Sequence, residues 1–266
     1  MNDNELRGAV REKYGRIAEA TPSGSGCCGS SCGCGSGSGN GLDQLGYTAE
    51  QRAAVPDGAD LGLGCGNPLA GAGVVPGETI LDLGSGAGID CFLAARETGP
   101  SGRVIGVDMT PAMREAAAAA ARRAGFGGIV EIREGFFERL PVADESVDLV
   151  LSNGVVNLSP DKEQVFREMH RVLKPGGRLY LADVVVQREL KDDVRNNPDL
   201  WAACIAGALP EPELATLALA TGFDEARIVE RFDCFRGTTA EVKVSGDLRV
   251  QAVNFHARKG SAAARR

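Results

Sequence analysis

Residues 78–98, ETILDLGSGAGIDCFLAARET, contain the pattern that decides the fold. An apolar run, a glycine-rich turn and a helical stretch follow one another directly, which predicts a buried strand that leads into a helix. The glycines permit a tight turn and let backbone N–H groups approach a ligand closely. Dinucleotide-binding enzymes share such a turn, so by itself it indicates a cofactor site and no particular cofactor.

Outward from this stretch, strands alternate with helices. Such alternation is typical of a parallel sheet with helices on both faces, so we expect an α/β fold with a doubly wound, mostly parallel sheet. The expected strands are 103–110, 129–135, 146–153 and 178–186, with sheet-edge strands at 226–235 and 248–259. The expected helices are 5–20, 49–54, 111–125, 198–209, 210–223 and one within 160–177 that Pro175, Gly176 and Gly177 stop.

Composition narrows the class of protein. The chain has 266 residues, 43% of them hydrophobic, and a formal net charge of −7, which argues against a nucleic-acid partner. No window approaches the roughly 18 apolar residues that a membrane span needs. We therefore expect a cytoplasmic protein without a membrane partner, in a compartment where thiols stay reduced and more often serve metals or chemistry than disulfides. The eight cysteines are Cys27, Cys28, Cys32, Cys34, Cys65, Cys91, Cys204 and Cys234.

Acidic and apolar residues near the strand ends narrow the choice of cofactor. Asp82 precedes the glycines, and Asp108 ends the next strand, where it can accept hydrogen bonds from ribose hydroxyls. Residues 134–141, EGFFERLP, offer apolar side chains to an adenine ring. A nicotinamide-binding module is the alternative, and it would need a hydride-transfer residue that the sequence does not show.

The ordered series DLGSGAG, GVDMT, FERLP, VDLVLSN and VLKPGG, within residues 78–186, resembles the class I S-adenosylmethionine-dependent methyltransferase family. The resemblance implies that S-adenosylmethionine binds at the carboxyl ends of the first, second and fourth strands. The residues it implies are Asp82, Gly84, Ser85, Gly86 and Gly88 at the methionine part, Asp108 at the ribose, Met109 and Phe137 beside the adenine, and Asn153 facing the sulfonium.

The sequence offers thiols where a methyltransferase often has a base. Histidine is a common base for methyl transfer to oxygen or nitrogen, but His170 and His256 are both expected to be structural. Trivalent arsenic prefers thiolate ligands, and when bound by two or three sulfurs it keeps an unprotonated lone pair. Such an acceptor needs positioning and no general base.

Four further stretches resemble the bacterial arsenite methyltransferases, and this likeness runs from residue 7 to about residue 223. The stretches are REKYG, CCGSSCGCG, LGLGCGNP and WAACIAGAL. The resemblance implies that Cys65 and Cys204 bind arsenic, that Cys27 and Cys28 deliver it or reduce intermediates, and that Tyr14 closes over the cofactor. It also implies arsenite or its thiol conjugates as substrate and a reductant such as glutathione or thioredoxin, in a detoxification reaction.

The chain departs from this family at two positions. Many relatives have a cysteine where Gly154 stands, and longer members have a third arsenic-binding cysteine near the position of Leu248. Cys234 could substitute as a ligand, although packing is the alternative for it. Cys91 is expected to be a small core residue. The cluster from Cys27 to Cys34 could instead bind zinc, and Tyr14 could simply pack its helix.

The sequence suggests five parts. They are an N-terminal helix (1–22), a flexible Cys/Gly/Ser-rich segment (23–41), the S-adenosylmethionine-binding core (42–188), an arsenic-binding C-terminal part that completes the sheet (189–258) and a tail (259–266). Two alternatives to arsenite methylation stay open. One is a methyltransferase of the same fold that acts on an organic small molecule such as a quinone, and the other is a metalloid-binding protein without turnover.

Overall fold

A computed structural model describes residues 3–20, 41–201, 204–232 and 249–261. Cys27, Cys28, Cys32, Cys34, Cys234 and Leu248 lie outside these residues, so the expectations placed on them have no structural counterpart here. The helices of the described residues are α1 (Asp3–Ala20), α2 (Gly41–Gln44), α3 (Ala49–Ala54), α4 (Ile89–Thr98), α5 (Pro111–Arg123), α6 (Lys162–Val172), α7 (Asp192–Arg195), α8 (Pro198–Trp201) and α9 (Glu211–Ala220), with a 3-10 turn at Val156–Leu158.

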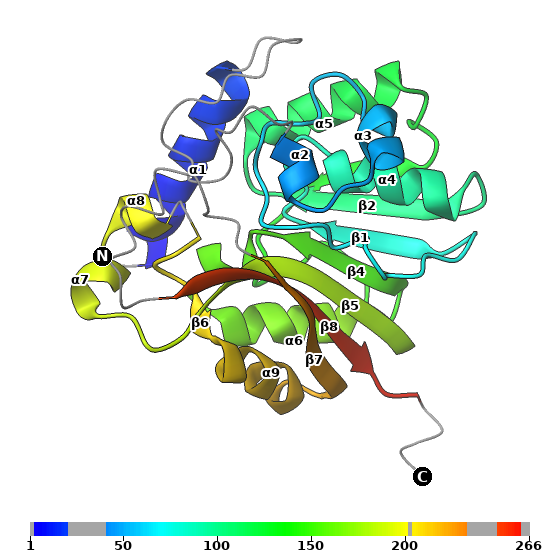
Figure 1. Cartoon of the computed structure of the whole chain (residues 1–266). Helices are drawn as coiled ribbons and strands as arrows, with labels where there is room; N and C mark the ends of the chain where they lie inside the picture. Colours follow the sequence, from blue (N-terminus) through cyan, green and yellow to red (C-terminus); the bar gives the residue numbers. More distant parts are fainter. Residues whose placement is uncertain (1–2, 21–40, 202–203, 233–248, 262–266) are drawn as a thin grey trace.

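The described strands form one sheet in the order β3-β2-β1-β4-β5-β8-β7, and β6 pairs with β5 (Figure 1). The strands β1 to β6 pair in parallel, whereas β8 runs antiparallel to both β5 and β7. This confirms the expected doubly wound, mostly parallel α/β fold. The strand bounds are β1 Thr79–Leu83, β2 Arg103–Asp108, β3 Val130–Glu134, β4 Val147–Asn153, β5 Leu173–Val186, β6 Leu209–Pro210, β7 Phe223–Phe232 and β8 Val250–Lys259.

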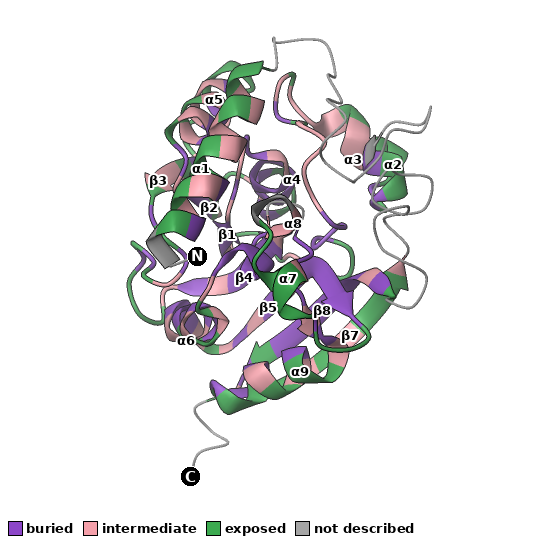
Figure 2. Ribbon diagram, turned by 90° about the vertical axis from the view of Figure 1, so that its left-hand side faces the viewer, coloured by how far each residue is buried: buried purple, intermediate pink, exposed green. Residues whose placement is uncertain are grey.

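Two apolar cores lie on opposite faces of the sheet, because successive side chains of a strand point to opposite sides. Leu81 packs with residues of α6 and α9, whereas its neighbour Ile80 packs with residues of α4 and α5. The central strands are therefore buried on both faces, as their continuous apolar sequence predicts. Figure 2 shows this burial in β4, β5 and β8, with exposed residues on the outer sides of the helices.

Local signals fix several helix starts. Thr48 and Gln51 form a capping box at α3, Pro111 stands at the first position of α5, and Asp161 caps α6 by accepting a hydrogen bond from the N–H of Gln164. One end differs from the expectation. Helix α6 ends at Val172 because β5 begins at Leu173, before the glycines that were expected to stop the helix.

The helix expected at 198–209 is wrong beyond Trp201, where α8 ends. Cys204 lies in a turn with a left-handed φ of +59°, and its N–H donates to the carbonyl of Trp201. Contacts outside the segment explain this: the Cys204 thiol donates to the carbonyl of Gly154, and a side chain on Gly207 would overlap the carbonyl of Asn157. Small apolar residues suit a helix in sequence, but here they allow a close approach to other elements.

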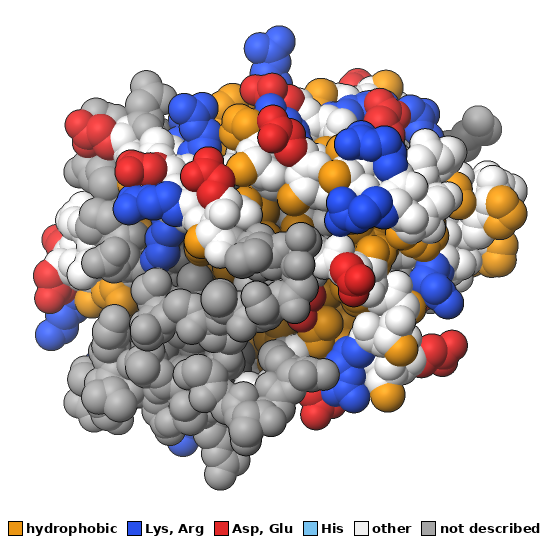
Figure 3. All heavy atoms as spheres, turned by 90° about the horizontal axis from the view of Figure 1, so that it is seen from above, with side chains coloured by type: hydrophobic (Ala, Val, Ile, Leu, Met, Phe, Trp, Pro, Cys, Tyr) orange, Lys and Arg blue, Asp and Glu red, His pale blue; other side chains and the backbone are white. Residues whose placement is uncertain are grey.

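Helix α1 packs against α5 at one end and α8 at the other, so it crosses the carboxyl-terminal side of the sheet (Figure 1). No helix in the described part of the chain is both long enough and apolar enough to span a membrane. On the face seen in Figure 3, acidic and basic side chains are interspersed.

Candidate functional site

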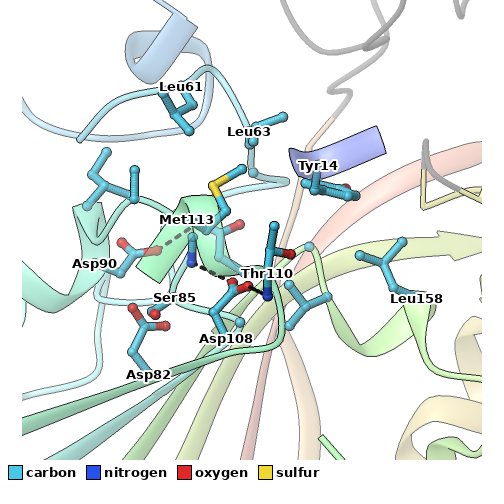
Figure 4. Close-up of a pocket in the computed structure, with 18 of the residues that line it drawn as sticks. Tyr14, Leu61, Leu63, Asp82, Ser85, Asp90, Asp108, Thr110, Met113 and Leu158 are labelled. Atoms are coloured by element: carbon cyan, nitrogen blue, oxygen red, sulfur yellow. Dashed lines mark hydrogen bonds between the residues drawn. The ribbon is translucent and has the colours of Figure 1, made fainter. Parts of the chain in front are cut away.

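A pocket opens where β1, β2 and β4 end, the place where parallel α/β sheets bind ligands. Its space, counted together with the solvent at its mouth, is about 1060 Å³. Figure 4 shows Asp82, Asp90 and Asp108 on one side of this space and Leu61, Leu63 and Tyr14 on the other. Every expected cofactor residue named above except Gly88 lines this pocket.

The backbone conformation of the glycine-rich turn forms part of the pocket wall. Gly84 has a φ of +73°, and a side chain there would overlap Val155. Gly86 has a φ of +51°, and a Cβ on it would meet nothing within 4 Å, so this glycine leaves room on the pocket side. The N–H groups of Gly84 and Ser85 donate to the carbonyl of Val107, and that of Gly86 donates to Asp108 Oδ2 at 2.9 Å. These three N–H groups therefore hold the turn against β2, where the sequence suggested that they face the ligand.

Three buried carboxyl groups give the pocket an acidic character. Burial, together with the nearby charge of Asp90, raises the pKa of Asp82 to about 8, and burial raises the pKa of Asp90 to about 6. Burial also raises the pKa of Asp108. Among the described lining residues there is no Lys, Arg or His. A cationic ligand would stabilise these carboxylates, whereas the pyrophosphate of a dinucleotide would be repelled.

Asn153 connects the cofactor pocket to the loop of Cys65. Its side-chain oxygen accepts a hydrogen bond from the backbone N–H of Cys65 at 2.8 Å. Its amide nitrogen lies 3.0 Å from the Tyr47 hydroxyl, 3.0 Å from Asp90 Oδ2 and 2.8 Å from the carbonyl of Gly66. The residue lines the pocket as expected, but these contacts direct its amide toward the protein.

Tyr47 and Asp90 are site residues that the sequence reasoning missed. The Tyr47 hydroxyl donates to Asp90 Oδ1 at 2.6 Å, and both side chains are buried. Asp90 had a signal, because it is an acidic residue in the first helical turn after the glycine-rich motif. Tyr47 had none, since only the tertiary structure brings residues 47 and 90 together.

The thiols of Cys65 and Cys204 meet at the edge of the pocket. Their Sγ atoms and a carboxylate oxygen of Asp183 all lie within 4.8 Å of one another, and all three residues are buried. Cys204 Sγ donates to the carbonyl of Gly154 at 2.9 Å. Two thiols at this separation suit a soft, thiol-seeking centre.

Asp183 is a further residue that the sequence reasoning missed. Burial raises its pKa to about 6. Its Oδ1 accepts a hydrogen bond from the Asn157 amide at 2.8 Å and its Oδ2 accepts one from the Asn157 backbone N–H at 3.1 Å. The same Asn157 amide lies 3.2 Å from the carbonyl of Cys204. Asp183 therefore braces, through Asn157, the turn that presents Cys204.

Gly154 lies directly beside the thiols. A Cβ on this residue would lie 3.0 Å from Cys65 Sγ, and its φ is +70°. Cys91 is buried in the core as expected, with its Sγ 3.2 Å from Asp82 Oδ2. His170 packs against Phe223 and His256 against Tyr180, and neither histidine lines the pocket.

Comparison with known proteins agrees with this geometry. The methyltransferase domain family matches residues 75–233. The arsenite methyltransferase of Halobacterium salinarum is 48% identical over 236 residues, which are 85% of this chain and 59% of that protein. The human arsenite methyltransferase is 40% identical over 190 residues, 68% of this chain and 51% of that protein.

A solved structure is also similar. The arsenic(III) S-adenosylmethionine methyltransferase from Chlamydomonas reinhardtii superimposes with a TM-score of 0.67 at 35% identity, covering 83% of this chain and 73% of that chain. The chain spans between half and three fifths of the length of the two curated relatives. This chain therefore belongs to the methyltransferase domain family and, within it, to the family of the arsenite methyltransferases.

Proposed function

We propose that this protein transfers a methyl group from S-adenosylmethionine to trivalent arsenic that is held by Cys65 and Cys204. One observation carries the proposal: two buried thiols, 139 residues apart in the chain (204 minus 65), have Sγ atoms within 4.8 Å of each other beside the cofactor pocket. A methyltransferase that acts on a quinone needs no such pair.

The pocket residues fit S-adenosylmethionine. When bound, this cofactor supplies a methyl group on a positively charged sulfonium. The buried carboxyl groups of Asp82, Asp90 and Asp108 favour a ligand with positive charge, and the described lining contains no cation that would oppose it. The residues that we propose to hold the cofactor are Tyr14, Asp82, Gly84, Ser85, Gly86, Gly88, Asp108, Met109, Phe137 and Asn153, with Asn153 also positioning the Cys65 loop.

The two thiols would bind arsenic by ligand exchange. Each sulfur forms a bond to arsenic as a hydroxide or thiolate leaves, and the thiol proton goes to the leaving group, so no electrons are transferred. Arsenic then keeps its lone pair unprotonated, and no general base is required. The absence of histidine from the described pocket lining is compatible with such an acceptor.

The remaining parts of the proposal rest on the resemblance and on the state of the thiols. Arsenite would arrive free or as a thiol conjugate, with glutathione or thioredoxin as the reductant and Cys27 and Cys28 as candidates for delivery. Cys91 and Cys204 form no disulfide, which suits a reducing, cytosolic compartment.

Arsenic speciation tests the proposal. Purified protein is incubated with arsenite, a thiol and S-adenosylmethionine, and the arsenic products and S-adenosylhomocysteine are separated by chromatography. We expect methylated arsenic from the wild type, and a loss of at least about a hundredfold in Cys65→Ser and Cys204→Ser, with cofactor binding kept. If the protein binds arsenite but forms no S-adenosylhomocysteine, the alternative of a metalloid-binding protein without turnover is favoured. Full activity in either variant would refute the thiol site.

A further inference from the structure

A second pocket lies beside the first and carries positive charge. Two of its lining residues are cations, Lys162 and Arg195, and its acidic residue, Glu163, is paired with Arg167. The ring of Trp201 forms part of the wall. This pocket contrasts with the cofactor pocket, whose described lining has acidic side chains and no basic ones.

Lys162 has no carboxylate partner among the described ion pairs. Its ammonium donates to the carbonyl of Ser159 at 2.9 Å and lies 5.1 Å from the centre of the Trp201 ring. An ammonium has three N–H donors, so this contact set leaves donor capacity toward the pocket. Burial, with the nearby charge of Arg195, lowers the pKa of Lys162 to about 8, although the charges of Asp183 and Glu138 act in the opposite direction.

Arg195 supplies a second positive charge, at the exposed side of the pocket. Its Nε donates to the carbonyl of Leu190 at 3.2 Å, and it forms no ion pair with a described carboxylate. Its backbone carbonyl accepts a hydrogen bond from Trp201 Nε1 at 2.5 Å, which joins α7 to the Trp201 wall. A small carboxylate placed in this pocket would meet two cations held by different segments.

The two pockets share their borders. Helix α1 supplies Leu6 to the second pocket and Val10 to the cofactor pocket, and these residues are about 6 Å apart along the helix axis. Leu158, in the connection from β4 to α6, lines the cofactor pocket, and Lys162, the first residue of α6, lines the second one.

The turn of Cys204 is the third shared border. Its thiol faces the cofactor pocket, whereas Trp201 and Ala206, on either side in sequence, face the second pocket. The backbone N–H of Cys204 donates to the carbonyl of Trp201 at 2.9 Å, so the two faces belong to one hydrogen-bonded turn. A ligand anchored at Lys162 and Arg195 is therefore held next to the turn that carries an arsenic-binding thiol.

We propose that this second pocket binds the carboxylate groups of a small anionic thiol that carries arsenic to Cys204. The inference rests on the proposed function for its chemistry, which is a thiol exchange. The arsenic–sulfur bond to the carrier breaks, the bond to Cys204 Sγ forms, and the thiol proton of Cys204 passes to the departing carrier thiolate. Nothing is oxidised or reduced.

The chain's single tryptophan, Trp201, provides a direct readout. Its fluorescence is titrated with S-methylglutathione, which has the carboxylates of glutathione but no free thiol and carries no arsenic. We expect a saturable change in fluorescence, with weaker binding of S-methylglutathione at high salt. The affinity for S-methylglutathione should be at least about fivefold lower in Lys162→Gln and Arg195→Gln. Arg188→Gln removes an exposed arginine outside the pocket and should bind like the wild type.

The methylation assay supplies the second arm, with arsenite delivered either by glutathione or by uncharged 2-mercaptoethanol. Lys162→Gln should raise the KM for arsenite with glutathione and leave it unchanged with 2-mercaptoethanol, and thermal unfolding of each variant checks its fold. No saturable fluorescence change, or equal affinity in Lys162→Gln and Arg188→Gln, would overturn the inference. Failure of the wild type to methylate arsenic with either thiol would instead refute the proposed function. The fluorescence titration would still show whether the second pocket binds the carboxylates.

Discussion

The side-chain oxygen of Asn153, at the end of β4, accepts a hydrogen bond from the backbone N–H of Cys65, 88 residues earlier, at 2.8 Å. The same side chain contacts Tyr47 and Asp90, so one amide joins the cofactor pocket to the loop that carries Cys65, a proposed arsenic ligand. In the proposed reaction this one group would position both the cofactor and the arsenic ligand, and positioning is what a methyl transfer without a general base requires.

Replacing Asn153 with alanine should loosen the Cys65 loop. We expect methylation of arsenic to fall at least about tenfold and arsenite to bind more weakly, because four contacts of the amide are lost. Isothermal titration with arsenite and a methylation assay measure the two effects. Unchanged arsenite affinity in a folded Asn153→Ala protein would mean that the hydrogen bond to Cys65 does not position the thiol.

Tyr47→Phe removes a donor from a buried carboxylate. The Tyr47 hydroxyl lies 2.6 Å from Asp90 Oδ1, and a buried acceptor that loses its partner costs about 1–3 kcal/mol. Urea unfolding should therefore show a lower free energy of unfolding by about that amount. Tyr180→Phe is the matched control, because the Tyr180 hydroxyl has no hydrogen bond to a described residue, and it should change stability by less than about 0.5 kcal/mol.

The stability of the cofactor-free protein should depend on pH through Asp82. Its folded pKa is raised to about 8, above the unfolded value, so the folded state binds more protons and its stability falls as the pH rises toward 8. Thermal unfolding between pH 6.5 and 7.5 should show a falling midpoint, less steep in Asp82→Asn. The lowered pKa values of His256 and Lys162 have the opposite effect on stability, His256 below this range and Lys162 above it.

S-adenosylmethionine binding should show the opposite pH dependence. A cation favours the ionised form of Asp82, so binding releases protons, and the affinity should rise between pH 6.5 and 8. Titration calorimetry in two buffers of different ionisation enthalpy measures the protons released. An affinity that falls with pH over this range would contradict the role of these carboxyl groups.

Gly154→Ala should harm the thiol site. Its φ of +70° is unfavourable for residues with a side chain, and the added Cβ would lie 3.0 Å from Cys65 Sγ. We expect a loss of about 1–2 kcal/mol in the free energy of unfolding and weaker arsenite binding. Gly128→Ala is the control, because a Cβ there meets nothing within 4 Å. Equal stability of the two variants would show that the site relaxes around a side chain at position 154.

Local and periodic features of the sequence determined much of this protein. The run DLGSGAG and the alternation of strands with helices act over a few neighbouring residues, so they predicted the parallel sheet and the place of the cofactor pocket. The proximity of Cys65 and Cys204 came from a family resemblance, because spacing alone does not relate positions so far apart.

The tertiary structure decided the rest. Tyr47, Asp90 and Asp183 enter the site through contacts between segments that are distant in sequence, and no local pattern reports such contacts. The segment after Trp201 has a helical composition, but the hydrogen bond from the Cys204 thiol to the carbonyl of Gly154 and the close packing of Gly207 favour a turn. Helical propensity amounts to a few tenths of a kcal/mol per residue, which such tertiary contacts outweigh.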